Sequence, residues 1–136
     1  MANAIGMVEF NSMSRGIYSA DQMVKVSEVE IVTSSPTCPG KYIAVVHGDV
    51  AAVETSVKAG EKNADEYLVD SIVIPNVHPL VFPAITGTTM PEDISAVGIV
   101  ESFSMATMVI MADAILKAAD SVGRSEERRV GKECRS

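Results

Sequence analysis

Residues 4–10 read Ala-Ile-Gly-Met-Val-Glu-Phe, a short and almost wholly apolar run that stops at the polar pair Asn11–Ser12. A run of this length between polar residues is typical of a buried β-strand. Helical spacing begins directly afterwards, with small or apolar side chains on one face at Met13, Gly16, Ile17, Ala20 and Val24. The start of the chain therefore predicts a buried strand followed by an amphipathic helix.

The following segments complete one α+β domain. Residues 28–32 alternate between polar and apolar side chains, which predicts a half-exposed strand, and the apolar run 42–46 is its expected hairpin partner. Asp49 is a suitable N-cap for a longer helix, and residues 68–74 predict a last strand that ends at Pro75. We expect the inner face of the longer helix to carry Val50, Val53, Val57 and Ala64.

Residues 34–41, Ser-Ser-Pro-Thr-Cys-Pro-Gly-Lys, separate the two hairpin strands. Neither proline has an N–H group, so neither is expected to extend a strand ladder. Gly40 can adopt a positive φ where the chain turns back. This stretch therefore predicts a stiff loop that displays the thiol of Cys38 at its tip.

Composition bounds the class of protein. Hydrophobic residues make up 47% of the 136 residues, which indicates a globular chain, and the net charge of −7 argues against nucleic acid as a partner. No apolar run approaches the ~18 residues needed to span a bilayer. The first residues lack the basic and apolar regions of a secretion signal, and two cysteines in different settings do not form a disulfide framework. We expect a cytoplasmic protein that binds neither nucleic acid nor membrane.

The start of the chain recurs 92 residues later. Ala4–Glu9 (AIGMVE) matches Ala96–Glu101 (AVGIVE), and the helical stripe returns as Met105, Met108, Val109, Ala112 and Leu116. Self-similarity at a fixed offset signals tandem copies of one domain. We expect a complete domain at 1–84, a linker at 85–95 and the start of an incomplete second copy at 96–123. Without its remaining strands, this copy should leave Met105, Met108 and Leu116 exposed.

Residues 124–136 have neither helical nor strand periodicity and are rich in charge. They resemble a stretch found at the ends of many unrelated bacterial sequences as an artefact of sequencing or assembly. We interpret them as a non-native tail and exclude them, with Cys134, from the fold.

Three segments resemble the signature segments of bacterial microcompartment shell proteins: 4–9, 20–25 and 47–53. The loop 37–41 and the segment 68–71 resemble, more specifically, the tandem-domain iron–sulfur type from propanediol-utilisation microcompartments. The resemblance implies the BMC-domain fold, a ferredoxin-like four-stranded antiparallel sheet with helices on one face. It also implies a structural shell tile rather than an enzyme.

In that family, tandem chains form homotrimers that resemble hexamers, and the hairpin loop lines the central pore. The resemblance implies that Cys38 is the metal ligand of a 4Fe-4S cluster shared by three chains, for electron transfer or cluster repair across the shell. It further implies that Lys25 and Lys117 contact neighbouring tiles, and that other shell proteins and encapsulated redox enzymes are partners. The pore-loop residues would be Ser35, Pro36, Thr37, Pro39 and Gly40.

Other interpretations of Cys38 stay open on the residues alone. It could be a loop thiol without function, or the redox thiol of a small ferredoxin-like sensing or binding module. A pore tile without a cluster is a further alternative. A catalytic thiol would require a histidine base, but His47 lies at the far end of the following strand. We interpret His47 and His78 as structural, because two isolated histidines are a poor metal signal.

Overall fold

The computed structural model describes residues 4–88 and 93–118. The strand β1, Ala4–Phe10, is buried at all seven positions and lies inside a four-stranded antiparallel sheet of order β2-β3-β1-β4. Its neighbours are β3, Lys41–Gly48, where Met7 lies opposite Val45, and β4, Leu68–Ile74, where Met7 lies opposite Ile72. The predicted four-stranded antiparallel α+β fold is confirmed, and the bounds of β1 and β4 match the apolar runs of the sequence.

Two helices cover one face of the sheet, as the sequence predicts. Helix α1, Met13–Val26, begins after Ser12, whose Oγ accepts a hydrogen bond from the Arg15 N–H, and α2, Val50–Ala64, begins after Asp49. The short 3-10 helix η1, Asp65–Tyr67, leads from α2 into β4. The core on this side is made of aliphatic, methionine and aromatic side chains from β1, β3, α1 and α2, chiefly Val8, Phe10, Met23, Val46, Val53 and Val57.

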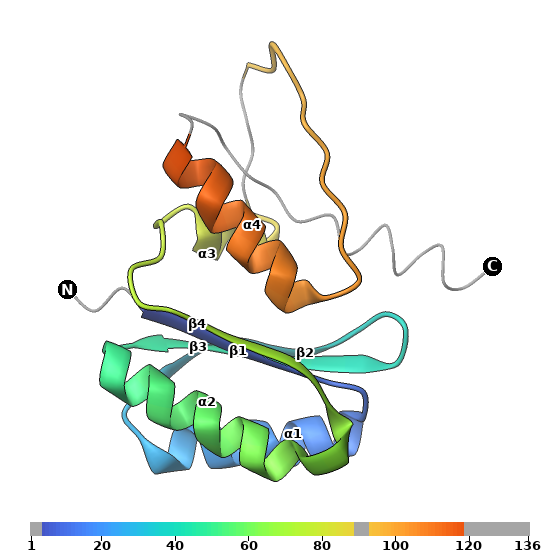
Figure 1. The fold of residues 1–136 in the computed structure, drawn as a ribbon, viewed down its shortest axis with the longest axis vertical. Helices are drawn as coiled ribbons and strands as arrows, with labels where there is room; N and C mark the ends of the chain where they lie inside the picture. Colours follow the sequence, from blue (N-terminus) through green and yellow to red (C-terminus); the bar gives the residue numbers. More distant parts are fainter. Residues whose placement is uncertain (1–3, 89–92, 119–136) are drawn as a thin grey trace.

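The other face of the sheet is also covered. Helices α3, Val81–Thr86, and α4, Met105–Ala118, lie across it, so the sheet is sandwiched between two helical layers (Figure 1). A second apolar core fills this side and includes Ile5, Met7, Ile43, Val45, Val77, Val81, Val109 and Leu116. A sheet that is apolar on both faces has to be covered on both faces.

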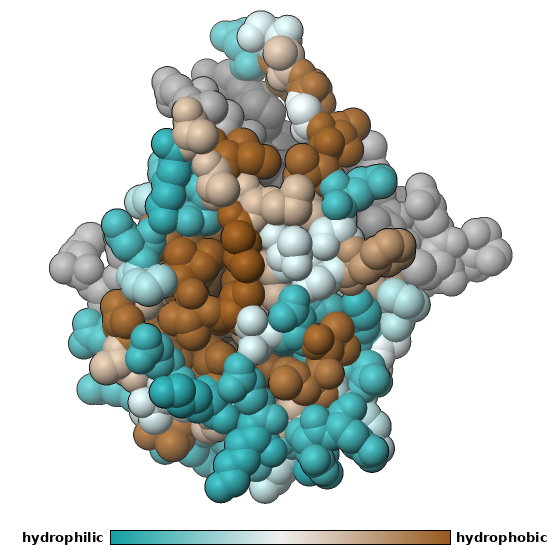
Figure 2. Space-filling view, in the orientation of Figure 1, coloured by the Kyte–Doolittle hydropathy of each residue, from teal (hydrophilic) through white to brown (hydrophobic). Residues whose placement is uncertain are grey.

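The fold corrects the prediction that Met105, Met108 and Leu116 are left exposed. Leu116 is 5% exposed, and Met105 and Met108 are half-buried, because α4 packs on the second face of the sheet. The preceding segment 96–101 nearly repeats the sequence of β1 and yet forms no strand. Its side chains are exposed, 84% for Ile99, and Figure 2 shows apolar atoms along it. A strand requires a partner, and the central position between β3 and β4, which the matching sequence would occupy, is already filled by β1.

Strand β2, Glu30–Thr37, runs further than the sequence predicts. Ser35, Pro36 and Thr37 were expected in the loop, but they pair with Ile43, Tyr42 and Lys41 of β3. Proline is tolerated here because β2 is an edge strand, so the missing N–H group removes no bond to a further strand.

One smaller prediction is also wrong. Val50 is 39% exposed rather than part of the inner stripe, because it occupies the first turn of α2, where the helix has not yet reached the sheet. The tail 124–136 with Cys134 lies outside the described residues, so its interpretation stays a prediction.

Gly6 marks a close approach of α2 to β1. A Cβ atom on Gly6 would lie 2.6 Å from Val57 Cγ2 and 2.7 Å from Val53 Cγ1, whereas a Cβ on the repeat-equivalent Gly98 would meet nothing within 4 Å. We therefore predict that Gly6→Ala lowers the free energy of unfolding by about 1–3 kcal/mol, as measured by denaturant titration. Gly98→Ala is the matched control, and equal effects of the two substitutions would contradict this packing.

Candidate functional site

The tip of the β2–β3 hairpin consists of Cys38, Pro39 and Gly40. All three are exposed, the Cys38 thiol is free, and the Cys38–Pro39 peptide bond is cis. Gly40 has a φ of 68°, the left-handed conformation that the sequence predicts for it. The hairpin extends beyond the other strands of the sheet (Figure 1). The expected display of the thiol at a hairpin tip is thus present, on a shorter loop than predicted.

Strand pairing holds the hairpin rigid up to its tip. Thr37 and Lys41 form the last pair, and the Ser34 hydroxyl lies 2.9 Å from the Tyr42 hydroxyl across the two strands. Ser35, Pro36 and Thr37 therefore support the tip from β2, whereas Pro39 and Gly40 belong to the turn itself. Such a tip can hold one sulfur atom in a fixed position relative to the sheet.

Lys41, at the base of the tip, joins the hairpin to the interior of the protein. Its Nζ donates to Glu9 Oε2 over 2.9 Å and to the carbonyl oxygen of Phe103 over 2.7 Å. Glu9 lies in the central strand and is only 1% exposed. A buried carboxylate is costly unless a cation and hydrogen-bond donors offset its desolvation, and Lys41 supplies the cation.

The other oxygen of the Glu9 carboxylate accepts hydrogen bonds from the N-terminus of α4. Glu9 Oε1 accepts from the N–H groups of Met105, at 2.8 Å, and Ala106, at 3.3 Å. Negative charge is favourable at a helix N-terminus, where the first N–H groups lack partners in the helix. The sequence analysis did not single out Glu9. The available signal was that Glu9 is the only charged residue of an otherwise apolar strand.

Polar contacts also fix the rest of α4 on the sheet. The Ser104 hydroxyl donates to Asp70 Oδ2 over 2.6 Å at the start of the helix. Near its end, Asp113 Oδ1 accepts from the His78 N–H at 2.7 Å, and Lys117 Nζ donates to the Asn76 carbonyl oxygen at 2.6 Å. Because these anchors lie at both ends of the helix, the position of α4 on this face is specific.

The predicted edge lysines lie on opposite faces of the sheet. Lys25 is exposed near the end of α1 and pairs with Asp21 one turn earlier. Lys117 pairs with Asp113 in the same i,i+4 arrangement, in addition to its bond to Asn76. Among the described residues, no hydrogen bond or ion pair joins either lysine to the Cys38 tip.

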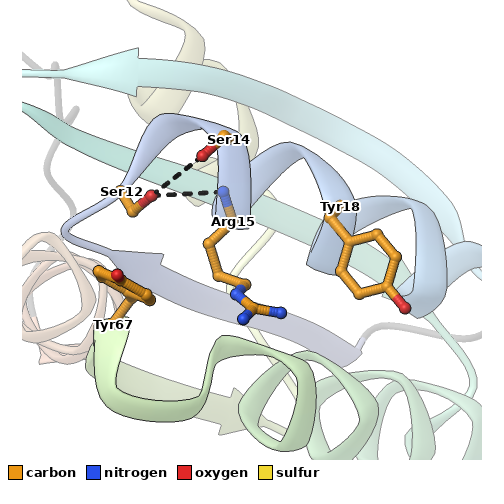
Figure 3. Close-up of a pocket in the computed structure, with 5 residues that line it drawn as sticks. All are labelled: Ser12, Ser14, Arg15, Tyr18 and Tyr67. Carbon is orange, nitrogen blue, oxygen red and sulfur yellow. Dashed lines mark hydrogen bonds between the residues drawn. The ribbon is translucent and has the colours of Figure 1, made fainter.

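Two open hollows lie away from the tip. One is lined by Ser12, Ser14, Arg15, Tyr18 and Tyr67, where the Arg15 side chain extends between the two tyrosine rings (Figure 3). The other lies beside His47, whose Nε2 is 3.2 Å from Glu30 Oε2 and whose ring meets Phe82 edge-on. Within residues 4–88 and 93–118, His, Cys, Asp and Glu side chains form no group of three that could hold a metal ion.

Comparison with known proteins gives a consistent result. The model of the BMC domain matches residues 4–77. Bacterial microcompartment shell protein PduT of Citrobacter freundii is 40% identical over 120 residues, which cover 88% of this chain and 65% of that protein. Carboxysome assembly protein CcmO of Synechocystis is 33% identical over 134 residues, or 87% of this chain and 44% of that protein. The crystal structure of a microcompartment protein from Desulfitobacterium hafniense DCB has a TM-score of 0.78 at 44% identity, over 88% of this chain and 66% of that one.

The sheet, its helical layers and the exposed hairpin tip define a structural α+β module of the microcompartment shell class. The chain belongs to the BMC-domain family of bacterial microcompartment shell proteins. Its relatives are named as shell and assembly proteins and not as enzymes. The chain spans just under two thirds of the length of the PduT relative and less than half of the CcmO relative. Among the described residues, no helix combines the length and hydrophobicity required to cross a bilayer.

The contacts of Glu9 generate a prediction about α4. Glu9→Gln keeps the size of the side chain but removes the charge that pairs with Lys41 and with the helix N-terminus. Loss of a charged hydrogen-bond acceptor should lower the free energy of unfolding by about 1.5–3 kcal/mol. Amide hydrogen exchange should also become faster in α4 before it changes in β1 or β3.

The control is Glu54→Gln, a charge-neutralising change at an exposed position of α2. Unchanged protection of α4 in Glu9→Gln, or an equal effect of both variants, would contradict the assigned role of Glu9.

Proposed function

We propose that this chain is a structural tile of a propanediol-utilisation type microcompartment shell in the cytoplasm, assembled as a homotrimer with Cys38 at its central pore. The observation that carries the proposal is the exposed, free thiol at the tip of a rigid hairpin in a BMC-domain fold. The similarity to PduT over 88% of the chain supports the type of shell.

The residues present fit a shared iron–sulfur cluster and do not fit one held by a single chain. Such clusters are bound by cysteine thiolates, commonly four, and Cys38 is the one cysteine of the described residues. Three tips around an axis would supply three thiolates and leave one iron corner for another ligand. Cys38 is exposed and unpaired, so its thiol is accessible to a ligand shared between chains.

When bound, the cluster would supply one-electron chemistry at the pore, for electron transfer to encapsulated redox enzymes or for cluster repair. The role of this chain is positional. Paired Thr37 and Lys41 hold the turn, and the Lys41–Glu9 ion pair fixes the base of the hairpin to the buried strand. Lys25, exposed on α1, is the proposed contact to neighbouring shell proteins, and Lys117 is its proposed counterpart in the second copy.

The domain organisation is part of the proposal. We place a complete domain at 1–84, a linker at 85–95 and the start of a second domain at 96–123. The equivalent i,i+4 pairs of α1 and α4, Asp21–Lys25 and Asp113–Lys117, support the internal repeat.

Iron content tests the cofactor and the assembly together. Protein purified without oxygen should contain about 1.3 iron atoms and as many sulfides per chain, because one four-iron cluster is divided among three chains. Sedimentation of the same sample should give a trimer. Cys38→Ser should lose the iron, whereas Ser35→Ala, a change in the same hairpin that removes no thiol, should retain it.

A full iron load in Cys38→Ser would exclude Cys38 as the ligand. An iron-free trimer would favour a pore tile without a cluster. An iron-free monomer with a reversibly oxidised thiol would instead favour the redox-sensing module, the candidate that the exposed thiol also supports.

A further inference from the structure

Helices α1 and α4 are equivalent in the internal repeat, and their first turns are built alike. In α1, Ser12 Oγ accepts from the Arg15 N–H and Ser12 O from the Gly16 N–H. In α4, Ser104 Oγ accepts from the Thr107 N–H and Ser104 O from the Met108 N–H. Figure 3 shows the first of these caps on α1. The two helices therefore present the same remaining N–H groups, those of their first two residues.

These remaining groups differ in what they bind. The N–H groups of Met105 and Ala106 donate to the Glu9 carboxylate. Their equivalents are the N–H groups of Met13 and Ser14, and no residue of 4–88 or 93–118 accepts from them. The first turn of α1 is thus an anion-binding terminus without its anion, whereas the equivalent turn of α4, on the other face of the sheet, has one.

The apolar faces differ in the same way. Val109 and Leu116 of α4 are 2% and 5% exposed against the sheet. Their equivalents at the offset of 92 are Ile17, which is 54% exposed, and Val24, which is half-buried. The face that α4 buries on a sheet is therefore present on α1 and uncovered in the single chain.

The polar anchors repeat as well. Asp113 and Lys117 bind backbone groups of the loop after β4, the His78 N–H and the Asn76 carbonyl oxygen. Asp21 and Lys25 are their equivalents, and they bind each other on an exposed surface. The carboxylate that corresponds to Glu9 in the repeat is Glu101, which is exposed.

We propose that the outer face of α1 docks on a second copy of this chain, with Glu101 of that copy as the carboxylate that caps Met13 and Ser14. Ile17 and Val24 are buried in this contact as Val109 and Leu116 are buried within the chain. The inference rests on the proposed assembly and specifies its interface. The contact of α4 with β1 within one chain is thereby repeated between chains, as a contact of α1 with the exposed segment 96–101, which nearly repeats the sequence of β1. Such head-to-tail contacts form a ring where the rotation between neighbouring chains closes.

The proposal places only one of two neighbouring side chains of similar exposure in the interface. Ile17 and Tyr18 are 54% and 50% exposed, but only Ile17 has a buried equivalent. The equivalent of Tyr18 is Ile110, which remains 47% exposed on α4. Tyr18 should therefore stay outside the interface.

Sedimentation equilibrium of the full chain, purified without oxygen, tests this interface. Ile17→Asp should weaken self-association at least about tenfold, because it places a charge in an apolar contact. Tyr18→Asp adds the same charge one residue later and should leave self-association unchanged. Circular dichroism should show that both variants remain folded, because both positions are exposed.

The possible outcomes separate this interface from the proposed assembly. A trimeric wild type whose Ile17→Asp variant is equally trimeric overturns the interface and leaves the trimer standing. Equal weakening by Ile17→Asp and Tyr18→Asp overturns the assignment of this face. A wild type that is monomeric at every concentration overturns the assembly and the interface together.

A second pair of variants tests the cap. Glu101→Gln should weaken self-association about five- to tenfold, because the charge at the helix N-terminus is lost. The control Glu54→Gln, exposed on α2, should have no effect. An unchanged trimer in Glu101→Gln excludes Glu101 as the capping group.

Discussion

The structure depends on one buried carboxylate, that of Glu9 in the central strand. The strand is otherwise apolar, and burial of a charge in such a place requires compensation by a cation and by hydrogen-bond donors. Lys41 and the N-terminus of α4 supply both. The base of the hairpin, the central strand and the fourth helix are therefore held at a single point, although they are far apart in the sequence.

This arrangement explains how a small sheet can present a defined tip. Helices α1 and α2 support one face and α3 and α4 the other, so both faces of the sheet are packed. The hairpin is left as the projecting part, and its strands remain paired up to Thr37 and Lys41. A thiol on such a support can be placed by the symmetry of an assembly, which a thiol on a mobile loop could not.

Much of the fold could be predicted from periodicity alone. The apolar runs at residues 4–10 and 68–74 became strands with those bounds, and the helical stripes became α1, α2 and α4. Errors arose where position in the fold outweighed local preference. Pro36 lies in a strand because β2 is at the edge of the sheet, and Val50 is exposed because it precedes the buried turns of α2. For the site, the exposed Cys38 tip could be predicted, but its support by Glu9 and Lys41 could not, because that contact joins residues 32 apart in the chain.

The sequence by itself determined the type of the four strands and of helices α1, α2 and α4, the thiol at the turn and the repeat that makes α1 and α4 equivalent. These properties depend on local spacing and composition, which are visible in one dimension. Only the tertiary structure decided which surface α4 covers. Helix α4 has apolar side chains on more than one face, with Val109 and Leu116 buried and Ile110 and Ile115 exposed, so periodicity could not select the buried face. The choice was made by the apolar second face of the sheet and by the buried charge of Glu9, which is stabilised by the N-terminus of this helix.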